Sequence, residues 1–312
     1  MMKRVLILLT AMLWVLQVHA APARHAIPAP KVVKVNDRIY ALLGPMALPN
    51  KENQGYMVNS TLILGESAAI LIDTGFTDEI GAHLRAAVEK ITKKPIKVII
   101  NTHHHGDHTF GNAAFPGAHV ISSEMARKLL LEGEADWLAI IEAAVGRKFP
   151  NTRAVPASEV YANNTRTDIV IDGVKLTLWV PNGAHTLGDL MIWLPEDKVL
   201  VGGDILVHQI TPNFRDAVVK MWVDVLAEVQ QLPAKTIIPG HGPLMAMKDA
   251  AAMHARMAKL YADVEAGYKA GLTDSEVRAR LDLRDWKKLH EFDQHMGGNI
   301  NRTYLEIEAA NF

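Results

Sequence analysis

The sequence contains no cysteine among its 312 residues. Disulfide bonds are therefore excluded, and stability must come from a hydrophobic core, for which an apolar share of 49% is sufficient. Excess charge of either sign is also lacking, because 33 basic residues face 34 acidic ones. A net charge of −1 creates no field that concentrates nucleic acid or anionic lipid. We therefore expect a small-molecule substrate and no nucleic-acid partner.

An apolar run long enough to span a membrane is lacking too. Residues 5–18 are uncharged and follow the basic pair Lys3-Arg4, but they fall short of the roughly 20 residues that a spanning helix needs. Small residues near position 20 predict a secretory signal peptide over 1–20, cut after Ala20, with a retained anchor as the alternative. The protein would then be periplasmic or secreted, with no membrane contact. Its net charge would be −3, because 31 basic residues remain against 34 acidic ones.

The apolar patterns predict two runs of strands, each followed by helices. Residues 21–30 are rich in proline and alanine and are expected to be loose. Strands are expected within 31–44, 56–73, 95–101, 119–121, 168–180, 190–194 and 199–201, and helices over 77–92, 123–132, 134–145 and 215–231. This order fits two sheets with helices on their outer faces. Residues 31–243 would form one catalytic domain.

Residues 244–312 are expected to form a helical extension packed on the same domain. Thr273 and Glu276 have the spacing of a capping box, and Gly297-Gly298 should break the region before a last helix. The extension could cover the two sheets, shape the mouth of the site or mediate dimerisation. His290 and His295 have no ligand spacing, so they are interpreted as surface or packing residues.

The densest chemical feature is the run from Thr102 to His108, in which His103, His105, Asp107 and His108 follow the order His-x-His-x-Asp-His. Crowded imidazoles repel one another once protonated, whereas a divalent metal turns each neutral nitrogen and each carboxylate oxygen into a ligand. The run follows an apolar, β-branched strand. His103 and His105 can therefore face one ion, while Gly106 lets the backbone turn and redirects the next two ligands to a second ion.

Three further residues of ligand type stand near glycine at expected strand ends. They are His185 in Asn182-Gly183-Ala184-His185, Asp204 after Gly202-Gly203, and His241 between Gly240 and Gly242. Each alone is more often a structural residue of a loop or a turn. Their joint occurrence after the histidine run favours a site for two metals.

With these residues the chain resembles the metallo-β-lactamase superfamily. The similarity covers about residues 31–243 and includes the segment from Leu71 to Gly75. It implies an α+β protein with a four-layer αββα sandwich and a metal pair at one edge of the sheets. By this likeness His103, His105 and His185 would hold the first metal, Asp107, His108 and His241 the second, and Asp204 would bridge them.

The bridging position distinguishes this chain from the cysteine-containing zinc β-lactamases. Asp204 stands where those enzymes have cysteine, so the chain looks more like glyoxalase II, the lactonases and other hydrolases of this fold. Two zinc ions are expected, and iron or manganese becomes admissible with an oxygen ligand.

A metal pair predicts a hydrolytic mechanism. Two ions lower the pKa of a shared water to roughly 7 or below, which supplies hydroxide at neutral pH. Asp107 would orient the hydroxide and carry a proton to the leaving group. Asp73 could orient a metal-bound imidazole or cap the turn at Thr74-Gly75, and the sequence leaves both open.

Asn182, His208 and Asn213 stand near the ligands in sequence and could contact substrate, although hydrogen bonding within loops is the favoured explanation for each of them.

Three functions remain open at this stage. The leading hypothesis is a dinuclear zinc hydrolase acting on a small ester, lactone, thioester or amide, with β-lactams included among the amides. The alternatives are an iron-dependent oxidoreductase of the same fold acting on a sulfur substrate, and a non-catalytic metal-binding protein. The substrate and the oligomeric state are not determined by the sequence.

Overall fold

The structure is a computed structural model, and it describes residues 26–311. The expected signal peptide, residues 1–20, lies outside this range, and so does half of the expected loose segment 21–30. Residues 26–30 form neither helix nor strand. No helix of the described range combines the length and the apolar character that crossing a membrane requires.

Two β-sheets form the centre of the molecule. The first has seven strands in the order β1 to β7, which are Lys31–Lys34, Ile39–Leu43, Ser60–Leu64, Ala69–Ile72, Ile96–Ile100, His119–Ser123 and Glu159–Tyr161. The second has five, in the order β12 (Thr236–His241), β11 (Val199–Val207), β10 (Met191–Leu194), β9 (Val174–Val180) and β8 (Thr165–Ile171). Strand β4 pairs in parallel with β5, and β11 pairs in parallel with β12.

The alternation of side chains along the strands divides the core between the layers. On β4, Ile70 and Ile72 belong to the cluster between the sheets, together with Leu176 and Leu178 of β9. Leu71 points to the opposite face, where it joins a second cluster. Because both faces of β4 are buried, it reads as a continuous apolar run in the sequence, whereas Lys175 of β9 is exposed.

Helices of the N-terminal half cover the outer face of the first sheet. They are α1 (Asp78–Ile91), α2 (Gly106–Thr109), a 3-10 helix (Phe110–Ala114), α3 (Glu124–Glu132) and α4 (Glu134–Val145). Thr77 caps α1 by accepting a hydrogen bond from the backbone N–H of Ile80. Ile80 and Leu84 of this helix contact the face of the sheet that carries Leu71.

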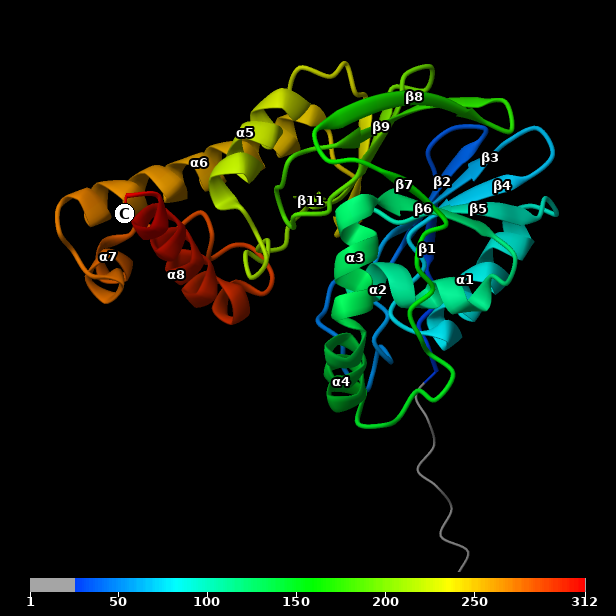
Figure 1. The fold of residues 1–312 in the computed structure, drawn as a ribbon, viewed down its shortest axis with the longest axis horizontal. Helices are drawn as coiled ribbons and strands as arrows, with labels where there is room; N and C mark the ends of the chain where they lie inside the picture. Colours follow the sequence, from blue (N-terminus) through cyan, green and yellow to red (C-terminus); the bar gives the residue numbers. More distant parts are fainter. Residues whose placement is uncertain (1–25, 312) are drawn as a thin grey trace, which may run out of the picture.

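Helices of the C-terminal half cover the outer face of the second sheet. They are α5 (Val219–Val229), α6 (Met247–Lys269), α7 (Asp274–Arg280) and α8 (Phe292–Ala310), of which α6, α7 and α8 extend as an arm beyond the sheets (Figure 1). Trp222 of α5 anchors this layer, because its buried indole donates to the carbonyl of Ile205 at 2.9 Å. The layers therefore follow the αββα order, as expected.

Three local expectations were wrong. The break expected at Gly297-Gly298 is absent, and α8 runs through both glycines because Met296 and Ile300 bury one side of the helix in the core. Strand β11 continues to Val207, so Asp204 lies inside it, between irregularities in its pairing with β12. Helix α5 begins at Val219 instead of 215, where the carboxylate of Glu306 accepts hydrogen bonds from its first backbone N–H groups.

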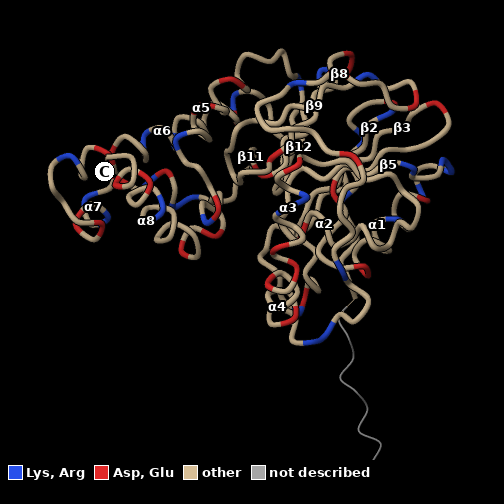
Figure 2. Tube along the Cα trace, in the orientation of Figure 1, with Lys and Arg blue, Asp and Glu red and all other residues tan. Residues whose placement is uncertain are grey.

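Charged residues of both signs are interspersed along the chain (Figure 2). Lysines and arginines alternate with acidic residues in the C-terminal arm as well as over the sheets, in keeping with the near-zero net charge.

Candidate metal centre and its cavity

The histidine run lies in the short connection between β5 and α2. Gly106 is the first residue of α2 and packs so closely on Phe76 that a Cβ atom would stand 2.4 Å from the ring. A side chain at this position would push the helix away from Phe76. Glycine thus lets α2 begin directly after His105, which turns Asp107 and His108 in a new direction, as the sequence suggested.

The first group of converging side chains consists of His103, His105, His185 and Asp204. One ligand atom from each lies within 4.8 Å of the others. The Nε2 atom of His185 is 3.2 Å from Nδ1 of His105 and 3.6 Å from Oδ2 of Asp204. The four residues come from three connections or strands that are remote in the chain.

The second group consists of Asp107, His108 and His241. The Nε2 atoms of His108 and His241 are 3.3 Å apart, and they lie 3.3 and 3.2 Å from Oδ2 of Asp107. Asp204 reaches this group too, with Oδ1 at 3.4 Å from His108 and Oδ2 at 3.4 Å from His241. Its carboxylate therefore stands between the two groups, where a bridging ligand would have to be.

The donor set fits metal ions. Ligands around tetrahedral zinc lie about 3.3 Å apart, given bonds of about 2.0 Å to nitrogen or oxygen, and the measured separations cluster at that value. Nε2 of His103 and Oδ1 of Asp204 are buried without any hydrogen-bond partner. Buried polar atoms are almost always paired, so donor atoms buried among these residues without a hydrogen-bond partner indicate a cation.

Hydrogen bonds to the remote ring nitrogens fix four of the five imidazoles. Asp73 accepts from Nδ1 of His108 at 2.8 Å, and Met57 offers its carbonyl oxygen to Nδ1 of His241 at 3.2 Å. Thr102 lies 3.1 Å from Nδ1 of His103. Such contacts select the tautomer that directs the other nitrogen inward.

Of the two roles considered for Asp73, the structure shows the contact with an imidazole, that of His108, and not a cap on the turn at Thr74-Gly75. Its carboxylate also accepts from the backbone N–H and the hydroxyl of Thr102, and its backbone has a φ of +57°, a left-handed conformation that is rare outside glycine.

Asp216 orients His105 in the same way as Asp73 orients His108. The sequence analysis did not identify Asp216 as a residue of the site. Its carboxylate accepts a hydrogen bond from Nε2 of His105 at 2.9 Å. In the sequence Asp216 reads as an ordinary acidic residue in the first turn of the helix expected at 215–231. His104 does face away from the first group, and it lies with His105 and Asp216 instead.

The electrostatics of the metal-free site separate the two groups. Burial and the neighbouring imidazoles lower the pKa of His103 well below its usual value and that of His185 to about 3. Burial also disfavours charge on His241, but the carboxylates of Asp204 and Asp107 outweigh it and raise its pKa to about 10. The carboxylates outweigh burial at His108 as well and raise its pKa well above the usual value, so His108 and His241 hold a proton more tightly than His103 and His185.

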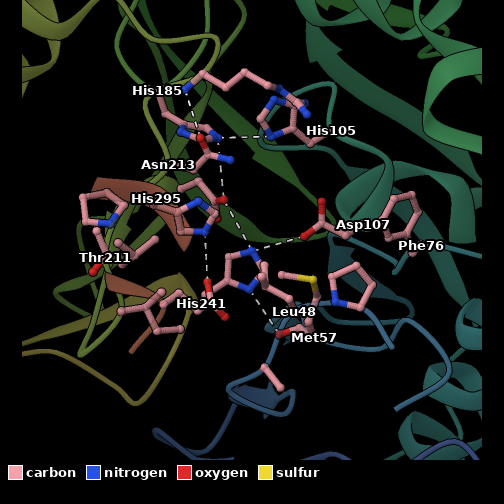
Figure 3. A pocket seen from close by; sticks show the side chains of 18 of the residues that line it. Leu48, Met57, Phe76, His105, Asp107, His185, Thr211, Asn213, His241 and His295 are labelled. Carbon is pink, nitrogen blue, oxygen red and sulfur yellow. Dashed lines mark hydrogen bonds and ion pairs between the residues drawn. The ribbon is translucent and has the colours of Figure 1, made fainter. Parts of the chain in front are cut away.

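A cavity of about 330 Å³ opens onto both groups, and Figure 3 shows His105, Asp107, His185 and His241 around it. Its walls are largely apolar. Phe76 and the α4 residues Trp137 and Ile140 contribute to them, and so do Leu48 and Met57 from the segment between β2 and β3. The cavity thus offers reactive groups on one side and space for a small, partly apolar molecule on the other.

Of the three residues proposed for substrate contact, only Asn213 lines this cavity. Asn182 is exposed in a separate groove beside Trp179 and Met221, because the loop turns at Gly183 before His185 enters the site. The Nδ1 atom of His208 is within 3.2 Å of the carbonyl oxygens of Pro243 and Leu244, outside the cavity. The prediction of substrate contact was therefore wrong for Asn182 and His208, which are near the ligands in sequence but do not line the cavity.

The C-terminal extension also contributes to the wall. His295, interpreted as a surface or packing residue, lines the cavity (Figure 3). Glu291 and Arg215 line it as well. The sequence contained no pattern that links residue 295 to the histidine run.

Comparison with known proteins gives one family. The sequence model of the metallo-beta-lactamase superfamily matches residues 53–241. Curated relatives include a beta-lactamase-like protein 2 homolog of Caenorhabditis elegans, 26% identical over 69% of this chain and 64% of that protein. A linear primary-alkylsulfatase of Pseudomonas is 27% identical over 58% of this chain, and a metallo-beta-lactamase type 2 of Bacillus cereus is 24% identical over 59%. The chain spans 40% and 66% of the lengths of these last two.

Solved structures share the fold. A metallo-beta-lactamase from Pontibacter korlensis has a TM-score of 0.56 and 23% identity, covering 73% of this chain and 99% of that one. The sec-alkylsulfatase Pisa1 from Pseudomonas has a TM-score of 0.67 and 19% identity, covering 88% of this chain and 50% of that one.

Proposed function

The chain belongs to the metallo-β-lactamase superfamily, and we propose that it is a dinuclear zinc hydrolase that cleaves a carbonyl bond in a small molecule. Esters, lactones, thioesters and amides, β-lactams among them, are the substrate classes considered. The observation that carries the proposal is the convergence of His103, His105, His185, Asp107, His108, His241 and the shared Asp204 at ligand spacing.

The residues of the chain have separate tasks in this proposal. Two zinc ions bound there would supply hydroxide at neutral pH and polarise the carbonyl group. Asp204 sets the separation of the two ligand groups, and Asp107 orients the attacking oxygen from the cavity wall. Asp73 and Asp216 hold His108 and His105 in place. The five histidine ligands favour zinc, while Asp107 and Asp204 also admit iron or manganese.

A second candidate substrate class is the alkyl sulfate esters. The likeness to Pisa1 extends over 88% of this chain, more than the 73% covered by the metallo-beta-lactamase from Pontibacter korlensis. The apolar cavity walls also suit an alkyl group.

The test combines metal analysis with a substrate panel. We expect about two zinc ions per chain in protein loaded with zinc and desalted, and metal-dependent hydrolysis of at least one ester, lactone, thioester, cephalosporin or alkyl sulfate. A fully zinc-loaded protein that turns over no member of the panel would contradict the proposal. Iron as the metal retained on purification from cells, with oxygen-dependent turnover of a thiol, would support the oxidoreductase alternative.

A further inference from the structure

Glu291 and His295 form a hydrogen-bonded pair in the wall of the cavity, outside the residues that match the superfamily. The Nε2 atom of His295 donates to Oε2 of Glu291 at 3.2 Å. Their side chains are only 15% and 11% exposed. The C-terminal extension thus brings a titratable pair to the space that faces the metal ligands.

This pair differs from an ordinary surface pair on a helix. Glutamate and histidine four residues apart are common on helices and contribute little when exposed. Glu291, however, precedes α8 and has a φ of +61°, a conformation that costs free energy for a residue other than glycine. The surroundings must therefore hold Glu291 in place against its own preference.

Backbone pairing fastens Glu291 to the loop that follows β11. The N–H of His290 donates to the carbonyl of Gln209, and the N–H of Thr211 donates to the carbonyl of His290, both at 2.9 Å. Ile210 and His290 form an isolated parallel bridge. Gln209 is left-handed as well, at +61°. The pair is therefore fixed relative to Asp204, which lies on the same strand that leads into this loop.

The position of the pair suits a proton donor. His295 and the ligand candidates His241 and Asp107 line the same cavity (Figure 3). Asp107 directs Oδ2 at His108 and His241, as expected for a metal ligand, so a different residue is needed to donate a proton. Glu291 pairs with Nε2 of His295. Within the described residues, the other ring nitrogen, Nδ1, makes no hydrogen bond. This nitrogen is free to meet a substrate.

We propose that the Glu291–His295 pair protonates the leaving group of the substrate, which adds a residue of the extension to the catalytic machinery. The inference rests on the proposed hydrolytic function. Hydroxide forms a bond to the carbonyl carbon, and the bond to the leaving oxygen breaks with its electron pair on that oxygen. The proton of the His295 imidazolium moves to this oxygen, and solvent reprotonates the imidazole. Glu291 stabilises the imidazolium and orients the ring.

The test varies the leaving group. Zinc-loaded wild type, His295→Gln and Glu291→Gln are compared on phenyl acetate, 4-nitrophenyl acetate and 2,4-dinitrophenyl acetate. For His295→Gln we expect kcat on phenyl acetate to fall about 100-fold, and kcat on the dinitrophenyl ester to change less than about threefold, because an acidic phenol leaves without a proton. Glu291→Gln should show the same trend with a smaller loss, and it replaces His295→Gln if that variant fails to fold.

His290→Gln is the matched control, because the exposed His290 contacts the loop through its backbone alone. It should behave as wild type on all three esters. Zinc content and melting temperature are measured for each variant. Equal losses on all leaving groups would overturn the assignment and leave the hydrolase intact. A zinc-loaded wild type that hydrolyses none of the esters would overturn the assignment together with ester hydrolysis itself.

Discussion

The carboxylates of the site differ in what they contact, and this determines what each can do. Asp204 faces both ligand groups, Asp107 faces one group and the cavity, and Asp73 and Asp216 each accept a hydrogen bond from a histidine of the run. Under the proposed function these four carboxylates would have three roles: bridging the metals, orienting the nucleophile and positioning a ligand.

Asp107 tests the role of the orienting group. Asp107→Asn keeps the size of the side chain but removes its negative charge, so turnover should be lost while at least one metal remains bound. Rates are measured together with zinc content. His103→Ala is the companion variant and should lose metal and activity together. Near-normal rates of Asp107→Asn with two metals verified would contradict the assigned role.

Asp216 tests the positioning of His105. Asp216→Asn keeps an acceptor oxygen but removes the negative charge that strengthens the hydrogen bond from Nε2 of His105, so the variant should weaken zinc binding about 10- to 100-fold. Competition with a chelator measures this loss. Asp224→Asn is the control, because Asp224 forms an exposed pair with Lys220 on α5. Equal zinc affinity of both variants would assign Asp216 to the surface rather than to the site.

The protonation of His241 predicts how metal binding depends on pH. Its pKa is about 10 without metal, because the carboxylates of Asp204 and Asp107 outweigh burial. Burial disfavours charge on His108 too, but Asp107, Asp204 and Asp73 outweigh it and raise the pKa of His108 well above its usual value. A ligand must be neutral, so zinc has to displace a proton from each of these two histidines at pH 7, and affinity should rise by at least about tenfold per pH unit from pH 6 to 8. Calorimetry in buffers with different ionisation enthalpies counts the released protons. Affinity that is flat over this range would show that the ligands are already neutral.

At the scale of elements, α8 holds the loop between β11 and α5. Asn299, which is buried, accepts from the N–H of Phe214 at 2.9 Å and donates to the carbonyl of Pro212 at 2.7 Å. Arg302 donates to the carbonyl of Ala217, and Glu306 caps α5. The loop carries Asn213, Arg215 and Asp216, so the extension stabilises residues of the cavity and of the metal site.

Asn299→Ala tests how much the hydrogen bonds of Asn299 to Phe214 and Pro212 stabilise the protein. The variant leaves a buried N–H and a buried carbonyl without partners, so the free energy of unfolding should fall by about 2–4 kcal/mol. Denaturant unfolding measures it. Asn301→Ala serves as the control, because the Asn301 side chain is exposed and its bond to Asp274 spans 3.2 Å. A loss below about 0.5 kcal/mol for Asn299→Ala would show that water replaces the hydrogen bonds of Asn299.

At the scale of the whole molecule, the fold brings residues from Pro45 to His295 to one cavity. The extension takes part in the same layer as the outer face of the second sheet, where Met257 and Leu260 of α6 and Ile300 of α8 share a core cluster with Trp222. The extension thus packs against the layer of α5 on the second sheet and also lines the cavity through His295.

Export is the prediction that belongs to the whole chain. The uncharged run at 5–18 after Lys3-Arg4 predicts cleavage after Ala20, so the protein made in a bacterial host with its leader should begin at Ala21 and have its mass reduced accordingly. Mass spectrometry of the periplasmic fraction checks both. An intact N-terminus found in the membrane fraction would favour the retained anchor.

The sequence by itself determined the layers and the ligand types. Apolar runs at β4, β5 and β9 and the spacing of His103, His105, Asp107 and His108 depend on local periodicity, which is visible along the chain. His185, Asp204 and His241 could be identified through the resemblance, because each stands beside glycine in a recognisable segment.

Tertiary structure alone decided the positioning residues and the cavity wall. Asp216 meets His105 across 111 positions, and Glu291 and His295 reach the cavity because the segment before α8 pairs with residues 209–211. Asn182 and His208 are near ligands in sequence but are turned away from the cavity by the path of their loops. Contacts between distant segments depend on how the layers pack, and no local pattern records that packing.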